Sequence, residues 1–183
     1  SVPKIYNYIQ HHVYDGKPID NEIIDLGFWP GGDRDGNPFV TTEITLNVAE
    51  RLRQTVLRSY YRDVRRLKRR FTFDGVQDIL ARVEKRLYKH VVRSYTKVNF
   101  SQKILLEELY AAREIIVNEH QSLFVEELND FINKVRIFGF HFATLDIRQD
   151  SRVHHKAFVQ IVKDLQSQGD TTFPENYLSL SEE

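Results

Sequence analysis

The sequence predicts a mainly α-helical protein, a bundle of long helices with two short β-strands. Apolar side chains recur at spacings of three and four over most of the chain, which is the pattern of amphipathic helices. Only residues 23–29 and 140–148 have the apolar, β-branched and aromatic content of strands, and each run ends at a polar cluster.

The composition fits one globular domain or one piece of a larger protein. The 183 residues suffice for a core, and 41% hydrophobic with 28% charged residues is ordinary for a globular chain. Lys plus Arg and Asp plus Glu balance at 26 each, so no net field favours nucleic acid or an anionic membrane. No apolar run approaches the roughly 18 residues of a membrane span.

The chain contains no cysteine, which excludes disulfides, thiolate metal sites and cysteine nucleophiles. This composition is compatible with a reducing compartment, and we expect a cytoplasmic protein. The chain starts at Ser1 without a methionine and ends on a polar tail, so we expect residues 1–183 to be a single fragment of a larger chain.

The first helix is predicted over residues 3–14, with Pro3 near its start. Residues 15–18 form a turn, and the strand at 23–29 leads into a glycine-rich loop at 30–38.

A long helix is predicted to begin at Thr42, which we expect to be its N-cap, and to be interrupted at 71–75. The side chains expected on its buried face are Leu52, Val56, Tyr60, Val64, Leu67 and Phe71.

Three further helices are predicted over residues 75–95, 101–120 and 121–137, the second of them capped by Ser101. The side chains expected to face the core are Val76, Ile79, Leu80, Val83, Leu87 and Val91, then Leu105, Leu109, Ala112 and Ile116, then Leu123, Phe124, Leu128, Phe131, Ile132 and Val135.

Gly139 ends this helical pattern, and residues 140–148 are predicted to form a buried strand. Ser151 is expected to cap a last helix that runs to about Gln166 and is ended by Gly169.

The densest feature of the sequence is the stretch 28–38, with three glycines, two prolines, two aspartates and an arginine. Glycines let a backbone approach a ligand closely or adopt positive φ. Gly31 and Gly36 have the spacing of a phosphate loop, but Asn37 and Pro38 stand where such a loop needs Lys and Ser or Thr. A structural connection whose carboxylates cap nearby amides remains an alternative.

A calcium loop is a weaker interpretation of the same stretch. Asp33, Asp35 and Asn37 match its first three ligands, but Pro38 replaces the required glycine and Ile44 replaces the final glutamate.

The second polar cluster follows the predicted strand at 140–148. Because side chains alternate along a strand, Asp146 and Arg148 share one face. An arginine at the carboxyl end of a buried strand suits a phosphate or carboxylate ligand, and Asp146 is expected to orient it. A purely structural ion pair between Asp146 and Arg148 is the alternative.

A basic stretch lies on the long helix: Arg58, Arg62, Arg65, Arg66, Lys68, Arg69 and Arg70. Part of it forms a stripe opposite the apolar face, as expected either of a solvated helix face or of a surface for an anionic metabolite or nucleic acid. A non-catalytic helical module that uses this face to bind a partner is therefore the alternative function.

The histidines give no metal site. His11 and His12, like His154 and His155, are neighbours that diverge by about 100° on a helix and do not readily share a metal. His141 is expected in the core or behind the site, and no zinc motif is present.

Together the two polar clusters resemble the phosphoenolpyruvate carboxylase family. The stretch from Trp29 to Pro38, followed by the stretch from Leu145 to Ser151, matches two family motifs in the same order with a long helical insert between them. Asp150 replaces the family's glutamate, and Pro30 replaces a bulky apolar residue.

The resemblance implies a lyase that joins phosphoenolpyruvate and bicarbonate into oxaloacetate and phosphate with Mg²⁺ or Mn²⁺. It also implies a (β/α)₈ barrel elaborated with helices, a homotetramer, and the remainder of the enzyme chain as this segment's partner, with no nucleic acid or membrane.

The resemblance further implies residue roles. Arg148 would bind the substrate phosphate, and Trp29 would lie beside the methylene end of the substrate. The residues implied in substrate binding are Arg148, Trp29, Arg34, Asp33, Asp35 and Asn37, supported by Asp146, Gly31, Gly32 and Gly36.

The family's catalytic histidine motif, its mobile glycine- and arginine-rich loop and its metal-binding carboxylates have no counterpart in this sequence. We therefore expect a segment from the amino-terminal half of such an enzyme, with no catalytic residue and no metal ligand, that is inactive alone.

Overall fold

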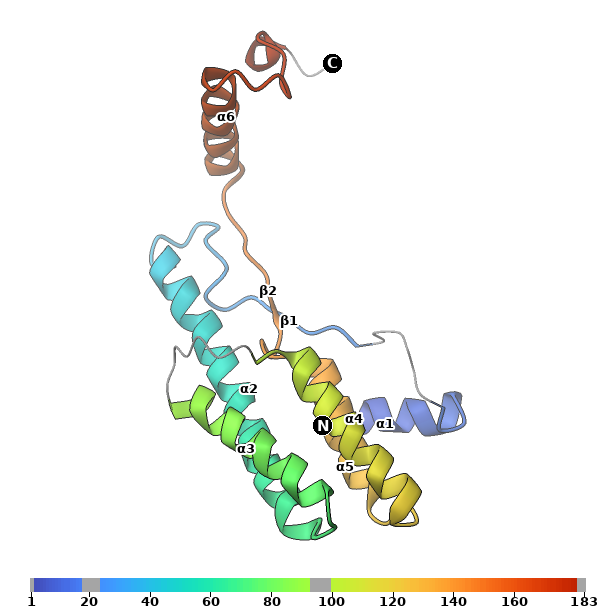
Figure 1. Ribbon diagram of the computed structural model, residues 1–183. Helices are drawn as coiled ribbons and strands as arrows, with labels where there is room; N and C mark the ends of the chain where they lie inside the picture. Colours follow the sequence, from blue (N-terminus) through green and yellow to red (C-terminus); the bar gives the residue numbers. More distant parts are fainter. Residues whose placement is uncertain (1, 18–23, 93–99, 181–183) are drawn as a thin grey trace. The chain divides into compact units, whose positions relative to one another are not determined.

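The computed structural model describes residues 2–17, 24–92 and 100–180. In chain order the elements are α1 (Val2–Val13), β1 (Gly27–Phe28), α2 (Thr42–Arg70), α3 (Val76–Val92), α4 (Gln102–Glu119), α5 (Val125–Phe138), β2 (Thr144–Leu145), α6 (Ser151–Ser167) and the short 3₁₀ helix η1 (Tyr177–Ser179), as Figure 1 shows. The mainly helical prediction with two short strands is confirmed. No helix in the described ranges has the length and apolar character needed to cross a membrane.

The chain forms two compact units. The first contains the chain up to Phe28 together with Leu46–Leu145, and the second contains Trp29–Thr45 together with the chain from Asp146 onward. The first unit is therefore the helical bundle, and the second carries both polar clusters that the sequence singled out.

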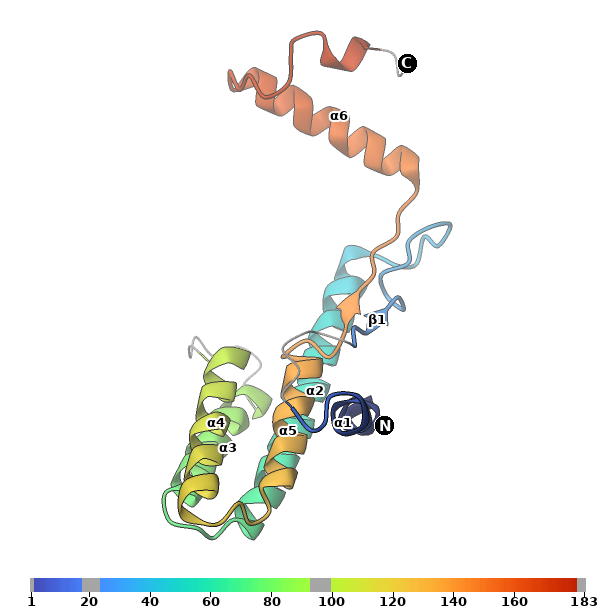
Figure 2. The ribbon, with the colours of Figure 1, turned by 90° about the vertical axis from the view of Figure 1, so that its right-hand side faces the viewer.

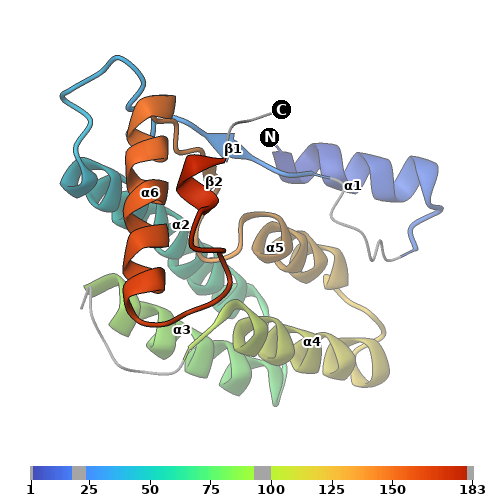
Figure 3. The same cartoon turned by 90° about the horizontal axis from the view of Figure 1, so that it is seen from above.

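In the first unit α4 packs against both α3 and α5, and α1 packs against α5. Viewed from above, α1 and α4 lie on opposite sides of α5 (Figure 3). Figure 2 shows α1 crossing beside α5 rather than running along it.

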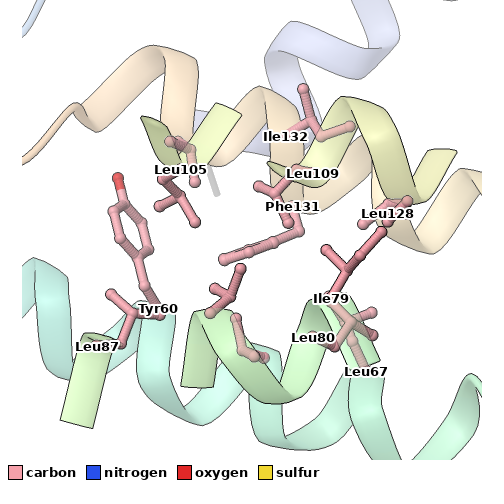
Figure 4. Close-up of a cluster of buried hydrophobic side chains, with 14 of the residues drawn as sticks. Tyr60, Leu67, Ile79, Leu80, Leu87, Leu105, Leu109, Leu128, Phe131 and Ile132 are labelled. Carbon is pink, nitrogen blue, oxygen red and sulfur yellow. The ribbon is translucent and has the colours of Figure 1, made fainter. Parts of the chain in front are cut away.

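The apolar faces of α2 to α5 meet in one core (Figure 4). The residues of this core that are fully enclosed include Tyr60, Val64, Phe71, Leu80, Leu87, Leu105, Leu109, Ile116 and Leu128. The Tyr60 ring meets Phe131 edge to face with 5.7 Å between ring centroids. These are the helical faces that the spacing of three and four predicted. Side chains at this spacing lie on one face of a helix, and that face is the one buried in the core.

The Tyr60 hydroxyl joins α2 to the end of α5 by donating to the Gly139 carbonyl over 2.7 Å. Burial raises the pKa of this hydroxyl, and the nearby charge of Asp63 raises it further, so the hydroxyl remains a proton donor.

Much of the basic stretch of α2 is neutralised by neighbouring helices. Arg65 and Lys68 both contact Glu84 of α3, and Arg70 lies 2.9 Å from Glu127 of α5. Arg66 pairs with Asp63 within α2 over 3.4 Å. Three of the seven basic residues therefore join α2 to its neighbours, whereas Arg58, Arg62 and Arg69 are exposed and form no ion pair with the described residues.

The two strands pair in parallel, with Gly27 opposite Thr144 and Phe28 opposite Leu145. Both strands are shorter than predicted, and the start of the first prediction, at residue 23, lies outside the described residues. The prediction of a buried strand at 140–148 is wrong, because β2 has only one neighbouring strand among the described residues and Ile147 is 59% exposed.

His141 was expected in the core or behind the site; it is exposed, so it is not a core residue. It lies just after α5, in a segment of turns that precedes β2, so it gains none of the enclosure that a central strand would give.

The predicted caps are confirmed in one case of three. The Ser101 hydroxyl accepts from the amide of Ile104 over 3.3 Å, as expected for the N-cap of α4. The cap of α2 is Thr41 rather than Thr42, since the Thr41 hydroxyl accepts from the amide of Ile44. In α6 the carboxylate of Asp150, one residue before Ser151, takes the role.

The helix predicted from residue 121 begins only at Val125. Gln121, Ser122 and Phe124 have positive φ angles, so the chain turns here instead of continuing a helix. The expectation that Leu123 and Phe124 face the core is accordingly wrong, as both are exposed. The ends of the predicted helix at 75–95 and of the predicted turn at 15–18 lie outside the described residues.

The core predicts a large contrast between two leucine substitutions. Leu105→Ala empties a fully buried position and should lower the free energy of unfolding by about 2–5 kcal/mol, measured by urea denaturation. Leu46→Ala, at a helical position that is 66% exposed, is the matched control and should change it by less than about 0.5 kcal/mol. Equal losses for the two variants would contradict the packing described.

Candidate functional site

The second unit is organised around the glycine-rich turn that follows β1. The carbonyl of Trp29 accepts from the amides of Gly32 and Asp33 over 3.0 and 3.2 Å, which closes the turn. Gly31 has a φ of +83°, a conformation that a side chain would strain.

The polar side chains of the turn bind its own backbone. A carboxylate oxygen of Asp33 accepts from the amide of Asp35 over 3.3 Å, and the side-chain oxygen of Asn37 accepts from the amide of Phe39 over 3.1 Å. These side chains therefore shape the loop, which is how Asp and Asn commonly stabilise turns.

The turn meets the second polar cluster through backbone contacts. The amide of Arg148 donates to the Gly32 carbonyl, and the amide of Arg34 donates to the Arg148 carbonyl, both over 2.9 Å. Asp33 and Arg148 thus form a parallel bridge, and in Figure 2 the segments that follow β1 and β2 run side by side. Two motifs far apart in sequence meet here within one compact unit.

Gly32 is required at this crossing for reasons of space. A Cβ atom on residue 32 would lie 2.1 Å from the carbonyl oxygen of Asp146, far inside van der Waals contact. The glycine therefore permits two backbones to approach more closely than any side chain would allow.

Arg34 and Thr45 add a side-chain link across the turn. A terminal nitrogen of the Arg34 guanidinium donates to the Thr45 hydroxyl over 2.9 Å, and this hydroxyl donates to the Gly31 carbonyl over 2.8 Å. The Nε atom of Arg34 is buried and has no hydrogen-bond partner among the described residues. Thr45 was not singled out from the sequence, where it is one threonine among several near a helix start.

Arg148 itself is exposed, and its side chain makes no hydrogen bond or ion pair with the described residues. Asp146 is also exposed and forms no ion pair with Arg148 in the described structure; it contributes its backbone carbonyl at Gly32. Trp29 is 58% exposed. The unit thus exposes both a guanidinium without an ion-pair partner among the described residues and an apolar ring.

The carboxylate of Asp150 is paired with Arg152 rather than with Arg148. It accepts from the backbone and the guanidinium of Arg152, and these bonds lower the pKa of the Asp150 carboxyl below its ordinary value. It therefore does not neutralise Arg148.

The described residues offer no metal centre. No three His, Asp or Glu side chains come together in the ranges that the structure describes. The side chains of Asp33 and Asn37 accept from backbone amides of their own turn, and Asp35 contributes its backbone amide to Asp33, so nothing in this geometry supports the calcium interpretation.

The fold and the turn define a helical protein with an exposed arginine held beside a glycine-rich loop, an arrangement suited to an anionic ligand. A sequence model of the phosphoenolpyruvate carboxylase family matches residues 1–103 and 76–183. The chain belongs to this family.

Individual relatives agree with the family match. The phosphoenolpyruvate carboxylase of Nitrosomonas eutropha is 28% identical over 88% of this chain and 21% of its own length. Those of Rhodothermus marinus and Nitrosomonas europaea are 29% and 26% identical and cover 89% and 97% of this chain. The chain spans about a fifth of the length of the curated relatives it matches.

The close approach at Gly32 predicts a specific effect of a single methyl group. Gly32→Ala should push the turn away from Asp146 and speed hydrogen exchange of the Arg148 amide by roughly tenfold or more, because a lost buried hydrogen bond costs about 1 kcal/mol or more.

Gly36→Ala is the control for this experiment. Gly36 also has positive φ, at +68°, but a Cβ atom there would meet nothing within 4 Å. This variant should strain the backbone and leave the Arg148 amide protected. Equal exchange rates in the two variants would show that the crossing does not depend on the space at residue 32.

Proposed function

We propose that this chain supplies the substrate-phosphate site of a phosphoenolpyruvate carboxylase, which joins phosphoenolpyruvate and bicarbonate to give oxaloacetate and phosphate. The observation that carries the proposal is the exposed Arg148, held by backbone bonds to the glycine-rich turn and free of any carboxylate partner among the described residues. Membership in the family supplies the reaction.

The chemistry suits these residue types. The phosphoryl group must be held while it leaves the enol oxygen for bicarbonate, and a guanidinium stabilises its charge without acting as a nucleophile. The phosphorylated bicarbonate then breaks into carbon dioxide and phosphate, and the enolate must meet that carbon dioxide away from water. The exposed ring of Trp29, at the start of the same turn, would form part of an apolar wall that excludes water.

The remaining turn residues act on the site through its shape. We assign Asp33 and Asn37 to holding the loop, since their side chains accept from its amides, and Asp35 to the same loop through the backbone amide that it donates to Asp33. We assign Gly31, Gly32 and Gly36 to the conformation of the loop. Arg34 contributes a backbone bond to the Arg148 carbonyl, and Asp146 contributes the carbonyl packed on Gly32.

The full reaction needs protein beyond this chain. The helix α6 leaves Val153, Phe158 and Ile161 exposed, as expected if further protein covers them. We propose that the complete enzyme is a helix-elaborated (β/α)₈ barrel that assembles as a homotetramer in the cytoplasm. The Mg²⁺ or Mn²⁺ of the family would be held by residues elsewhere in that enzyme.

The alternative, a module that binds a partner through the basic stretch of α2, has less support. Carboxylates of α3, α5 and α2 itself already pair with Arg65, Lys68, Arg70 and Arg66. Arg58, Arg62 and Arg69 are exposed and form no ion pair with the described residues, so only part of the positive charge on that face remains free.

The proposed role of Arg148 predicts a selective loss. Arg148→Ala should abolish saturable binding of phosphoenolpyruvate to this chain, followed by ³¹P NMR titration. In a full-length enzyme that carries this segment, it should lower kcat/KM by about 2–3 kcal/mol of transition-state stabilisation. Arg152→Ala, whose guanidinium is paired with Asp150, is the control and should bind as the unaltered chain does. Undiminished binding by Arg148→Ala would refute the role.

The chain alone should not catalyse the reaction, since the family's catalytic histidine motif has no counterpart in this sequence. A coupled assay for oxaloacetate, with phosphoenolpyruvate, bicarbonate and Mg²⁺, should show no turnover above the blank. Reproducible turnover that disappears in Arg148→Ala would overturn this expectation.

A further inference from the structure

The hydroxyl of Thr45 makes two bonds that close the glycine-rich turn from inside. It accepts from the Arg34 guanidinium over 2.9 Å and donates to the Gly31 carbonyl over 2.8 Å. A hydroxyl has one proton and two lone pairs, so both bonds form together. Thr45 lies in the first turn of α2 and is only 6% exposed, so water does not readily replace it.

These two bonds fall on either side of the contact with Arg148. Gly32 and Asp33 lie opposite Arg148. Gly31 comes directly before these two residues in the chain, and Arg34 comes directly after them. The backbone amide of Arg34 also donates to the Arg148 carbonyl. One hydroxyl therefore fixes both ends of the short segment that holds Arg148.

The Arg34 guanidinium depends on this hydroxyl. Its Nε atom is buried without a partner, and Thr45 is the acceptor that its side chain has among the described residues. A buried donor without an acceptor is costly, so loss of the hydroxyl should drive the guanidinium towards solvent and draw the turn with it.

Thr55 shows what an ordinary helical threonine does in the same helix. Its hydroxyl donates to the Arg51 carbonyl, one turn earlier, over 2.7 Å, and makes no other side-chain bond in the described structure. The corresponding contact of Thr45, to the Thr41 carbonyl, is longer at 3.2 Å than its contact to Gly31. The Thr45 hydroxyl thus donates to the carbonyl of the glycine-rich turn at a shorter distance than to the carbonyl of its own helix.

We propose that Thr45 is a positioning residue, whose hydroxyl sets the glycine-rich turn against Arg148 and so fixes how the Arg148 guanidinium is presented. That this presentation serves substrate phosphate rests on the proposed function. The coupling from Thr45 through Arg34 and Gly31 to the Arg148 backbone does not rest on the proposed function.

The test compares three substitutions in the full chain. Thr45→Val keeps the shape and removes the hydroxyl, Thr45→Ser keeps the hydroxyl, and Thr55→Val removes a hydroxyl that does not touch the turn. NMR follows exchange of the Arg34 Nε proton and the Arg148 amide, and fluorescence follows Trp29, the only tryptophan in the sequence.

Thr45→Val should speed exchange of the Arg148 amide by roughly five- to tenfold, the equivalent of one lost hydrogen bond. It should also speed exchange of the Arg34 Nε proton, because that buried atom becomes exposed to water, and shift the Trp29 emission. In Thr45→Ser, which keeps the hydroxyl, both exchange rates should be close to those of the unaltered chain. Thr55→Val should likewise leave both rates and the Trp29 emission unchanged. Arg34→Gln, which removes the same link from the other side, should reproduce the Arg148 and Trp29 changes even if Thr45→Val folds poorly. Unchanged Arg148 exchange in Arg34→Gln or in folded Thr45→Val would overturn the proposal.

A phosphoenolpyruvate titration of the same variants separates this proposal from the proposed function. If the unaltered chain does not bind phosphoenolpyruvate but Thr45→Val still frees the Arg148 amide, the proposed function fails and the positioning role stands. If binding requires Arg148 but folded Thr45→Val leaves both binding and exchange unchanged, the positioning role fails and the proposed function stands.

Discussion

The site depends on one close contact, the approach of the backbone at Gly32 to the carbonyl of Asp146. Only a residue without a Cβ atom allows it, and the bonds between Gly32, Arg34 and Arg148 form because of it. This contact joins a turn near the start of the chain to a segment near its end. If the two separated, Arg148 would be an ordinary surface arginine with no fixed surroundings.

The helical bundle and the turn are stabilised by different interactions. In the first unit, apolar side chains enclosed between α2, α3, α4 and α5 supply most of the driving force, and ion pairs at their edges fix how α2 lies on its neighbours. The turn buries little apolar surface and is held by backbone bonds, two asparagine or aspartate side chains and the Thr45 hydroxyl. Such a site is sensitive to single atoms, whereas the bundle tolerates most exposed substitutions.

The sequence predicted the helices and their core well, because the spacing of Tyr60, Leu105 and similar residues reflects burial directly. It overestimated the strands at 23–29 and 140–148, since β-branched content does not reveal how many neighbouring strands exist to bury them. It misplaced two caps by one residue, because Thr41 and Thr42, or Asp150 and Ser151, are equally good by type. It singled out both polar clusters, which the structure brings together, but not Thr45, whose contacts no local pattern encodes.

Whether Arg148 and the glycine-rich turn form a single anion site can be tested by NMR titration of the ¹⁵N-labelled chain with inorganic phosphate. If they do, saturable shifts should be concentrated at the Arg148 guanidinium and the amides of Gly31 to Arg34. Shifts confined to the arginines of α2, with Arg148 and the turn unaffected, would contradict a single anion site.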